Sequence, residues 1–232
     1  MFTLKMKVTP FLLNILFLLI LLLMAPETEC NSHSPSLAKE FVSNNGLAIL
    51  PNILTLQEAQ EIKTSIASLS KTMRKETGSI AIGRVGCHVP QESKIIEYLL
   101  SSKVVSRIAR ITGKGQSLRA AEFPLEVRQY TIGSSMPLHK DEVLYKTPQI
   151  EFIYTVENSS DSVLQYIDRS GKMMTEWTQP NTLVVIQADA VLHAVTPTTR
   201  GSRTIIKGLL TTTDGKTEAY ERAMRTYKSG RR

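Results

Sequence analysis

Two short stretches hold the side chains best suited to bind a metal ion. The chain has only four histidines, and one of them, His139, stands two positions before an aspartate in "PLHKDEVLY". Residues i and i+2 of a β-strand point to the same face, so His139 and Asp141 are expected to project together while Lys140 turns away. A further histidine, His193, follows the apolar run "NTLVVIQADAVL". These three side chains would offer two imidazoles and one carboxylate to a single ion.

This set of ligands would leave other coordination positions open. Two histidines and one carboxylate on one face form the facial triad of non-haem iron(II) sites. Zinc hydrolases use the same types of ligand. A bare H-x-D with a distant histidine also occurs in chains that bind no metal, so these residues alone leave all three interpretations open.

The residues after His193 supply a cation. In "HAVTPTTRGSRTIIKG", Pro197 and Gly201 are expected to close a turn, after which the next strand returns antiparallel and brings Arg203 near the metal. A buried guanidinium without an anion is very costly, and a guanidinium can hold a carboxylate through two hydrogen bonds. The pattern therefore predicts a diacid ligand, with one end on the metal and the other on Arg203. Tyr130, on the preceding strand, is expected to add a hydroxyl to the same carboxylate.

A helical first part and a strand-rich second part are expected to position these residues. Thr55 is the expected N-cap of a helix over "LQEAQEIKTSIASLSK", in which apolar residues recur at helical spacing. The stretch "ESKIIEYLLSSKVVSRIARITGKG" indicates one or two more helices, ending at Gly113 and Gly115. From Pro124 the strand-forming runs are "PLEVRQYTIG", "QIEFIYTVEN", "SVLQYID", "NTLVVIQADAVLHAV" and "RTIIKGLLTTT". This order predicts an α+β domain with an antiparallel sandwich or barrel.

The N-terminus has the composition of a targeting segment. Lys5 and Lys7 precede a leucine-dense apolar run, as in a signal peptide or a short signal anchor. Either form would carry the domain into the secretory pathway, to the lumen of the endoplasmic reticulum or Golgi, with membrane contact only through an uncleaved segment. The expected organisation is a signal peptide or anchor over 1–30, a polar linker over 31–44, the main domain over 45–215 and a basic tail over 216–232.

The bulk composition narrows the class of partner. The 232 residues, 42% of them hydrophobic, suit one domain with a sizeable core. The net charge is +7, but the basic residues are scattered, and neither an RNA-binding aromatic signature nor zinc-finger spacing is present. Nucleic acid is therefore not an expected partner. Two cysteines, Cys30 and Cys87, are too few for a disulfide framework.

Taken together, the motifs resemble those of the prolyl 4-hydroxylase-like branch of the 2-oxoglutarate and Fe(II)-dependent dioxygenases. The family pattern is a tyrosine, a glycine-containing turn, H-x-D, an apolar strand and then H-x-x-x-P-x-x-x-G-x-(K/R). Every element is present in "EVRQYTIGSSMPLHKD", "IEFIYTVEN" and "NTLVVIQADAVLHAVTPTTRGSR", and "LAILPNILTLQEAQEIKTSI" is similar to the family's strand-then-helix opening. The resemblance covers roughly residues 45–213. It implies a double-stranded β-helix, or jelly roll, with N-terminal helices packed on one sheet.

By position, the resemblance implies that His139, Asp141 and His193 bind Fe(II) and that Arg203, assisted by Tyr130, holds the distal carboxylate of 2-oxoglutarate. It further implies O2 as a cosubstrate, L-ascorbate as a reductant, and hydroxylation of an unactivated C–H bond. The first expected substrate is a peptidyl proline in a protein or peptide. The alternatives are the same chemistry on another residue or on a small molecule, and an inactive binding module with this fold.

The chain departs from the family pattern beside the site. Met136 stands where many relatives have an aromatic residue before the first ligand, and Thr204 stands where many have one after the basic residue. Lys207, further along the same strand face as Arg203, is expected to line the pocket rim or to act as a second partner for an anion. Substrate contacts come from loops on a rigid scaffold, so these differences put the substrate in doubt and leave the predicted metal site unaffected.

Overall fold

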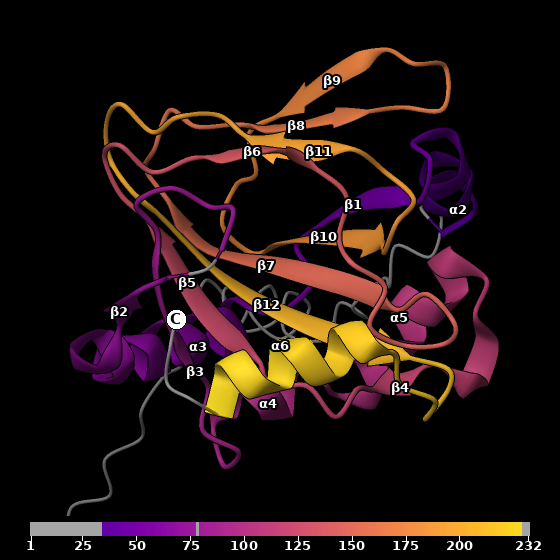
Figure 1. Ribbon diagram of the computed structural model, residues 1–232, viewed down its shortest axis with the longest axis horizontal. Helices are drawn as coiled ribbons and strands as arrows, with labels where there is room; N and C mark the ends of the chain where they lie inside the picture. Colours follow the sequence, from indigo (N-terminus) through magenta and orange to yellow (C-terminus); the bar gives the residue numbers. More distant parts are fainter. Residues whose placement is uncertain (1–33, 78, 229–232) are drawn as a thin grey trace, which may run out of the picture. The chain divides into compact units, whose positions relative to one another are not determined.

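The described part of the molecule is built on two antiparallel sheets (Figure 1). The computed structural model describes residues 34–77 and 79–228, and the signal or anchor segment expected over 1–30 lies outside them. The larger sheet has the order β1-β10-β7-β12-β5-β3-β2, with β4 paired to β12, and the smaller sheet has the order β6-β11-β8-β9. The strands are β1 (Leu47–Pro51), β2 (Arg74–Lys75), β3 (Val85–His88), β4 (Arg119–Ala120), β5 (Glu126–Tyr130), β6 (Met136–His139), β7 (Ile150–Asn158), β8 (Leu164–Ile167), β9 (Met173–Glu176), β10 (Thr182–Gln187), β11 (His193–Val195) and β12 (Arg203–Thr211).

Two helix boundaries match the signals in the local sequence. Thr55 caps one helix with a capping box, in which its side chain accepts from the Glu58 amide while the Glu58 carboxylate accepts from the Thr55 amide. Another ends at Gly113 in the left-handed conformation. None of the described helices has the length and hydrophobicity of a membrane span. The α-helices are α2 (Ser34–Ser43), α3 (Leu56–Leu69), α4 (Lys94–Leu99), α5 (Ser102–Thr112) and α6 (Glu218–Lys228).

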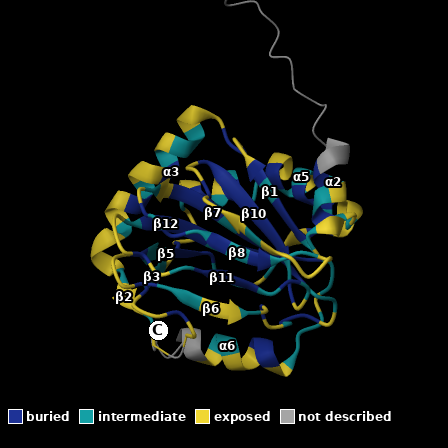
Figure 2. Ribbon diagram, turned by 90° about the horizontal axis from the view of Figure 1, so that it is seen from above, coloured by how far each residue is buried: buried dark blue, intermediate teal, exposed yellow. Residues whose placement is uncertain are grey.

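Strand β10 shows how the apolar runs build the core. Leu183 and Val185 join the cluster that includes the apolar faces of α2 to α5, whereas Val184 and Ile186 join a second cluster with residues of β8 in the smaller sheet. A strand that is covered on both faces reads as a continuous apolar run, and Figure 2 shows β10 and β7 as buried, with exposed residues on the outer surface of α3. The larger sheet is therefore a middle layer between the helices and the smaller sheet.

Residues Ser34–Ser43 form a helix, α2, where the composition suggested a polar linker over 31–44. Leu37 and Phe41 lie four residues apart on one helix face, and both are buried in the same cluster as residues of α3 and α5. These two side chains pack α2 on the core, whereas the serines around them give the stretch the composition of a linker.

The expected basic tail over 216–232 is also folded onto the domain. Helix α6 buries Ala219 and Tyr220 against Tyr145 and Leu209, and the Tyr220 hydroxyl donates to the Glu122 carbonyl at 2.6 Å. The amphipathic face of α6 thus closes a small core of its own at one end of the larger sheet.

Candidate metal centre

Strands β6 and β11 bring the two histidines together. His139 and His193 are direct cross-strand partners, and their ring centroids lie 4.2 Å apart. The H-x-D pattern predicted that His139 and Asp141 lie in one strand. Strand β6 ends at His139, so Asp141 lies two residues beyond the end of the strand. The outcome for the side chains is still the one predicted, because Asp141 is buried and Lys140 is exposed.

The three predicted ligands converge on one point. His193 Nε2 lies 3.4 Å from Asp141 Oδ2, and His139 Nε2 lies 3.8 Å from Asp141 Oδ1. Ligand atoms of all three residues lie within 4.8 Å of one another, and no other such group of three or more occurs in the described ranges. Such spacing suits three donors around a single ion.

Backbone carbonyls fix the orientation of both imidazoles. His139 Nδ1 lies 2.9 Å from the Pro137 carbonyl oxygen, and His193 Nδ1 lies 3.2 Å from that of Val191. A carbonyl can only accept, so each Nδ1 carries the proton and each Nε2 keeps its lone pair for a metal, as is usual for metal-binding histidines. His139 Nε2 and Asp141 Oδ2 are buried without a hydrogen-bond partner. Such atoms are costly unless something binds them, so the site fits a divalent cation with nitrogen and oxygen ligands.

The local electrostatics keep the triad in its metal-binding form. Burial opposes ionisation of Asp141, but the Lys207 ammonium and the two imidazoles outweigh it and hold the pKa of Asp141 well below its usual range. Burial, against the opposing charge of Asp141, lowers the pKa of His193. An ionised carboxylate beside a neutral imidazole is the state that binds a metal.

Arg203 and Tyr130 lie next to each other, as the diacid prediction requires. They are cross-strand partners on β12 and β5, and both line an inner cavity together with Asp141 and His193. Arg203 is buried, its Nε has no hydrogen-bond partner, and no carboxylate in the described ranges pairs with it. Burial lowers the pKa of Arg203. A buried, uncompensated guanidinium beside a metal site is what an anionic ligand would relieve.

The free volume of this inner cavity is about 40 Å³. Ligand pockets commonly have volumes of about 300–1,000 Å³, so a diacid fits here only if flexible side chains of the lining, Met136 and Lys207 among them, change position. The adjoining outer pocket has a volume of about 460 Å³ and is also lined by His139 and Asp141.

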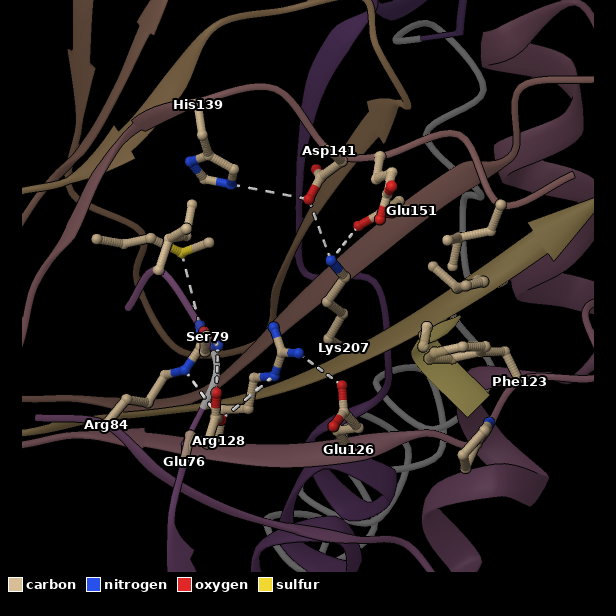
Figure 3. Close-up of a pocket in the computed structure, with 18 of the residues that line it drawn as sticks. Glu76, Ser79, Arg84, Phe123, Glu126, Arg128, His139, Asp141, Glu151 and Lys207 are labelled. Carbon is tan, nitrogen blue, oxygen red and sulfur yellow. Dashed lines mark hydrogen bonds and ion pairs between the residues drawn. The ribbon is translucent and has the colours of Figure 1, made fainter. Parts of the chain in front are cut away.

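A chain of ion pairs supports the Tyr130 side of the cavity, and its members were not predicted from the sequence. Arg84 Nη1 donates to the Tyr130 hydroxyl at 2.8 Å, and Arg84 pairs in turn with Glu76. Glu76 also lies 3.7 Å from Arg128, which pairs with Glu126. Figure 3 shows this chain beneath the pocket. One signal was available: the alternate residues of "EVRQY" are Glu126, Arg128 and Tyr130, which share a strand face.

Lys207, which was expected to line the pocket rim or to act as a second partner for an anion, lines both pockets, and its ammonium contacts carboxylates of the protein itself. Its Nζ lies 3.2 Å from Asp141 Oδ1 and also pairs with Glu151 of β7, as Figure 3 shows. Glu151 was missed, although an acid within the apolar run "QIEFIYTV" is a visible anomaly. Burial and the nearby Asp141 charge raise the pKa of Glu151 to about 7, against the effect of Lys207.

Gly201 controls the turn that returns the chain from His193 to Arg203. Its φ is +66°, and a Cβ there would meet the Ser159 carbonyl oxygen at 2.2 Å. We expect Gly201→Ala to lower the free energy of unfolding by about 3 kcal/mol, from left-handed strain and the clash together. Gly171→Ala is the matched control, because Gly171 has φ +85° with no atom within 4 Å of the added Cβ, so only the strain of about 1 kcal/mol applies. Equal losses for the two variants in urea unfolding would contradict the close contact at Gly201.

Sequence comparisons do not identify this chain, since no family model and no curated protein matches it. Comparison of structures does find relatives of its fold. A prolyl hydroxylase from Trichoplax adhaerens, solved with a peptide fragment of hypoxia inducible factor, superposes with a TM-score of 0.62 at 17% identity over 86% of this chain and 97% of that one.

Two further structures extend the comparison beyond prolyl hydroxylases. A 2OG-Fe(II) oxygenase family oxidoreductase from Burkholderia pseudomallei has a TM-score of 0.66 at 11% identity, over 78% of this chain and 92% of that one. The epimerase SnoN, solved with Fe3+, α-ketoglutarate and a nogalamycin ligand, has a TM-score of 0.64 at 12% identity, over 77% and 83% of the two chains. The described chain thus has the jelly-roll fold of the 2-oxoglutarate and iron(II) oxygenases, with a His-Asp-His triad.

Proposed function

We propose that this protein is an Fe(II)- and 2-oxoglutarate-dependent dioxygenase that hydroxylates an unactivated C–H bond. The observation that carries the proposal is that one buried site contains both metal-ligand atoms and a guanidinium nitrogen without hydrogen-bond partners. The lone pairs of His139 Nε2 and Asp141 Oδ2 lack a partner, and so does the guanidinium Nε of Arg203. In a zinc hydrolase the triad would bind Zn²⁺, but the buried Arg203 would have no role.

The residues of the chain would hold the reactants in place. His139, Asp141 and His193 would bind Fe(II) on one face, while Arg203 and the Tyr130 hydroxyl would bind the distal carboxylate of 2-oxoglutarate. Iron and 2-oxoglutarate, once bound, would supply the activation of O2 and the oxidative decarboxylation to succinate and CO2. The apolar neighbours Val195 and Ile205, buried in one cluster with Tyr130, would keep water away from the reaction.

Arg84 would act on the cosubstrate through Tyr130. Its Nη1 donates to the Tyr130 oxygen, so the Tyr130 proton points away from Arg84. The hydroxyl donates instead to the Met136 sulfur at 3.6 Å, a weak acceptor that a carboxylate would replace. A charged donor polarises the hydroxyl that it contacts, so Arg84 would make Tyr130 a stronger hydrogen-bond donor to the carboxylate.

A peptidyl proline is the first substrate to test. A structural relative was solved with a peptide in complex, and the outer pocket beside His139 and Asp141 is open enough to admit a side chain. The charged lining of this pocket, which includes Glu126, Arg128 and Glu151, would equally suit a small polar molecule, so the same chemistry on a small molecule is the second candidate.

The test is turnover of 2-oxoglutarate by the purified protein with Fe(II), O2 and L-ascorbate. Succinate release should rise when the right substrate is present, and the product should be heavier by one oxygen atom. Proline-containing peptides and small polar molecules are the two substrate panels. A protein that binds Fe(II) and 2-oxoglutarate but never releases succinate with either panel, or without substrate, would be a binding module instead.

The proposal includes a location. The charged and apolar order of residues 1–30 would place the domain in the lumen of the secretory pathway, where a secreted or resident protein would be the substrate. Protection of the domain from protease in sealed microsomes, lost on addition of detergent, would support that location.

A further inference from the structure

Lys207 contacts a predicted metal ligand directly. Its Nζ lies 3.2 Å from Asp141 Oδ1, and the same nitrogen pairs with Glu151. The three side chains are largely shielded from solvent, with exposed fractions of 19% for Lys207, 7% for Asp141 and 3% for Glu151. One ammonium is therefore shared between two buried carboxylates, from three separate segments of the chain.

The two oxygens of Asp141 have different surroundings. Oδ1 is occupied by Lys207, whereas Oδ2 is buried without a hydrogen-bond partner and lies 3.4 Å from His193 Nε2. A metal bound by the two imidazoles would take Oδ2, the oxygen that faces His193. Lys207 thus holds Asp141 by Oδ1, with the free oxygen Oδ2 turned toward His193.

A divalent ion at Oδ2 would lie close to the Lys207 ammonium. Like charges repel strongly where water is excluded, so the ammonium would oppose the ion if Asp141 were its only partner. Glu151 already contacts the same nitrogen and can hold the ammonium while Asp141 binds the ion. Gln149 steadies Glu151 in this role, because its Nε2 donates to Glu151 Oε1 at 3.2 Å.

We propose that Lys207 and Glu151 form a counter-ion switch for the metal site, in which Lys207 neutralises Asp141 in the metal-free protein and transfers to Glu151 when the ion binds. Both are positioning residues that act through Asp141. The inference rests on the proposed metal centre and extends it to residues that set the affinity for the ion.

The two residues should then change metal affinity in opposite directions. Glu151→Gln leaves the Lys207–Asp141 pair intact but removes the anion that receives Lys207, so Mn(II) affinity should fall about 10-fold, within the range known for groups that orient metal ligands. Lys207→Met removes the competing cation, so Mn(II) affinity should rise several-fold. Calorimetric titration with Mn(II), which needs no turnover, measures both.

The double variant Lys207→Met/Glu151→Gln sharpens the test. With both charges gone, the loss caused by Glu151→Gln should disappear, because no ammonium remains to be neutralised. Lys207→Met leaves two carboxylates without their shared cation and could fail to fold. Glu151→Gln then decides the case alone, since its metal-free form should melt near the wild-type temperature while gaining less stability from Mn(II).

Matched controls lie on either side of Asp141. Lys140 pairs with Asp189 and Glu142 with Arg222, and all four side chains are more than two-fifths exposed. Lys140→Met and Glu142→Gln should leave Mn(II) affinity unchanged. Affinity changes of the same sign in Glu151→Gln and Lys207→Met, or changes below about twofold in both, would overturn the switch. Absence of Mn(II) binding in the wild type would instead overturn the metal centre itself.

Discussion

His193→Ala is expected to abolish both metal binding and succinate release. The side chain supplies one of three converging ligand atoms, and its Nδ1 is already committed to the Val191 carbonyl, so no other part of the ring can compensate. Loss of a group that merely orients a ligand costs 10- to 100-fold, and loss of the ligand itself should exceed about 100-fold in affinity. Mn(II) titration and 2-oxoglutarate turnover measure the two effects independently.

The control for this variant is His88→Ala. His88 ends strand β3 and is exposed, and it does not belong to the group of three converging ligands. Its replacement should leave Mn(II) affinity at the wild-type level. Measurable turnover in His193→Ala, or equal loss of affinity in the two variants, would refute the assignment of the ligands.

Arg203→Met is expected to raise the KM for 2-oxoglutarate about 100-fold with a smaller change in kcat. Truncating one member of a buried charged pair costs 2–5 kcal/mol, and about 3 kcal/mol corresponds to that factor. The guanidinium is expected to contact the end of the cosubstrate far from the metal. Its loss should therefore weaken binding of the cosubstrate equally in the ground state and in the transition state. Arg203→Lys should recover part of the affinity, because it keeps the charge and loses the two-pronged geometry.

A truncated cosubstrate makes this prediction specific to one carboxylate. The wild type should use 2-oxobutyrate, which lacks the distal carboxylate, far less well than 2-oxoglutarate, and Arg203→Met should lose most of that preference. Arg200→Met is the matched control, since Arg200 is exposed in the same turn. This variant should keep the preference for 2-oxoglutarate over 2-oxobutyrate. An unchanged KM in Arg203→Met, or an undiminished preference for 2-oxoglutarate, would count against the role of Arg203.

The thermal stability of the ligand-free protein should not fall in Arg203→Met, although its affinity for 2-oxoglutarate should. In the absence of a ligand, Arg203 is a buried cation whose Nε has no partner, and replacing such a charge by a residue of similar volume is often neutral or stabilising. We therefore expect ligand-free Arg203→Met to melt at or above the wild-type temperature. A melting temperature at or above that of the wild type would show that the loss of cosubstrate affinity does not come from misfolding. Such a gain in stability on removal of a functional residue is typical of binding and catalytic sites.

Local sequence alone determined much of the frame. The capping box at Thr55, the left-handed Gly113 and the five long strand-forming runs were all readable, because caps, turns and periodicity depend on neighbours in the chain. The order H-x-D, then His193, then Arg203 after a Pro-Gly turn also defined the candidate site. The structure places these side chains together, since antiparallel pairing makes His139 and His193, and Tyr130 and Arg203, direct neighbours.

The tertiary structure decided what no local pattern could. Strand β7 brings Glu151 to Lys207, and the β2–β3 hairpin brings Arg84 to Tyr130, and both contacts join residues about fifty positions apart. A charged residue in a strand looks the same in sequence whether it meets solvent, a counter-ion or a metal ligand, because its energy depends on which group the fold places opposite it. The pairing of Lys207 with Asp141 and Glu151, and with it the proposed control of metal affinity, could therefore be seen only once the sheets were assembled.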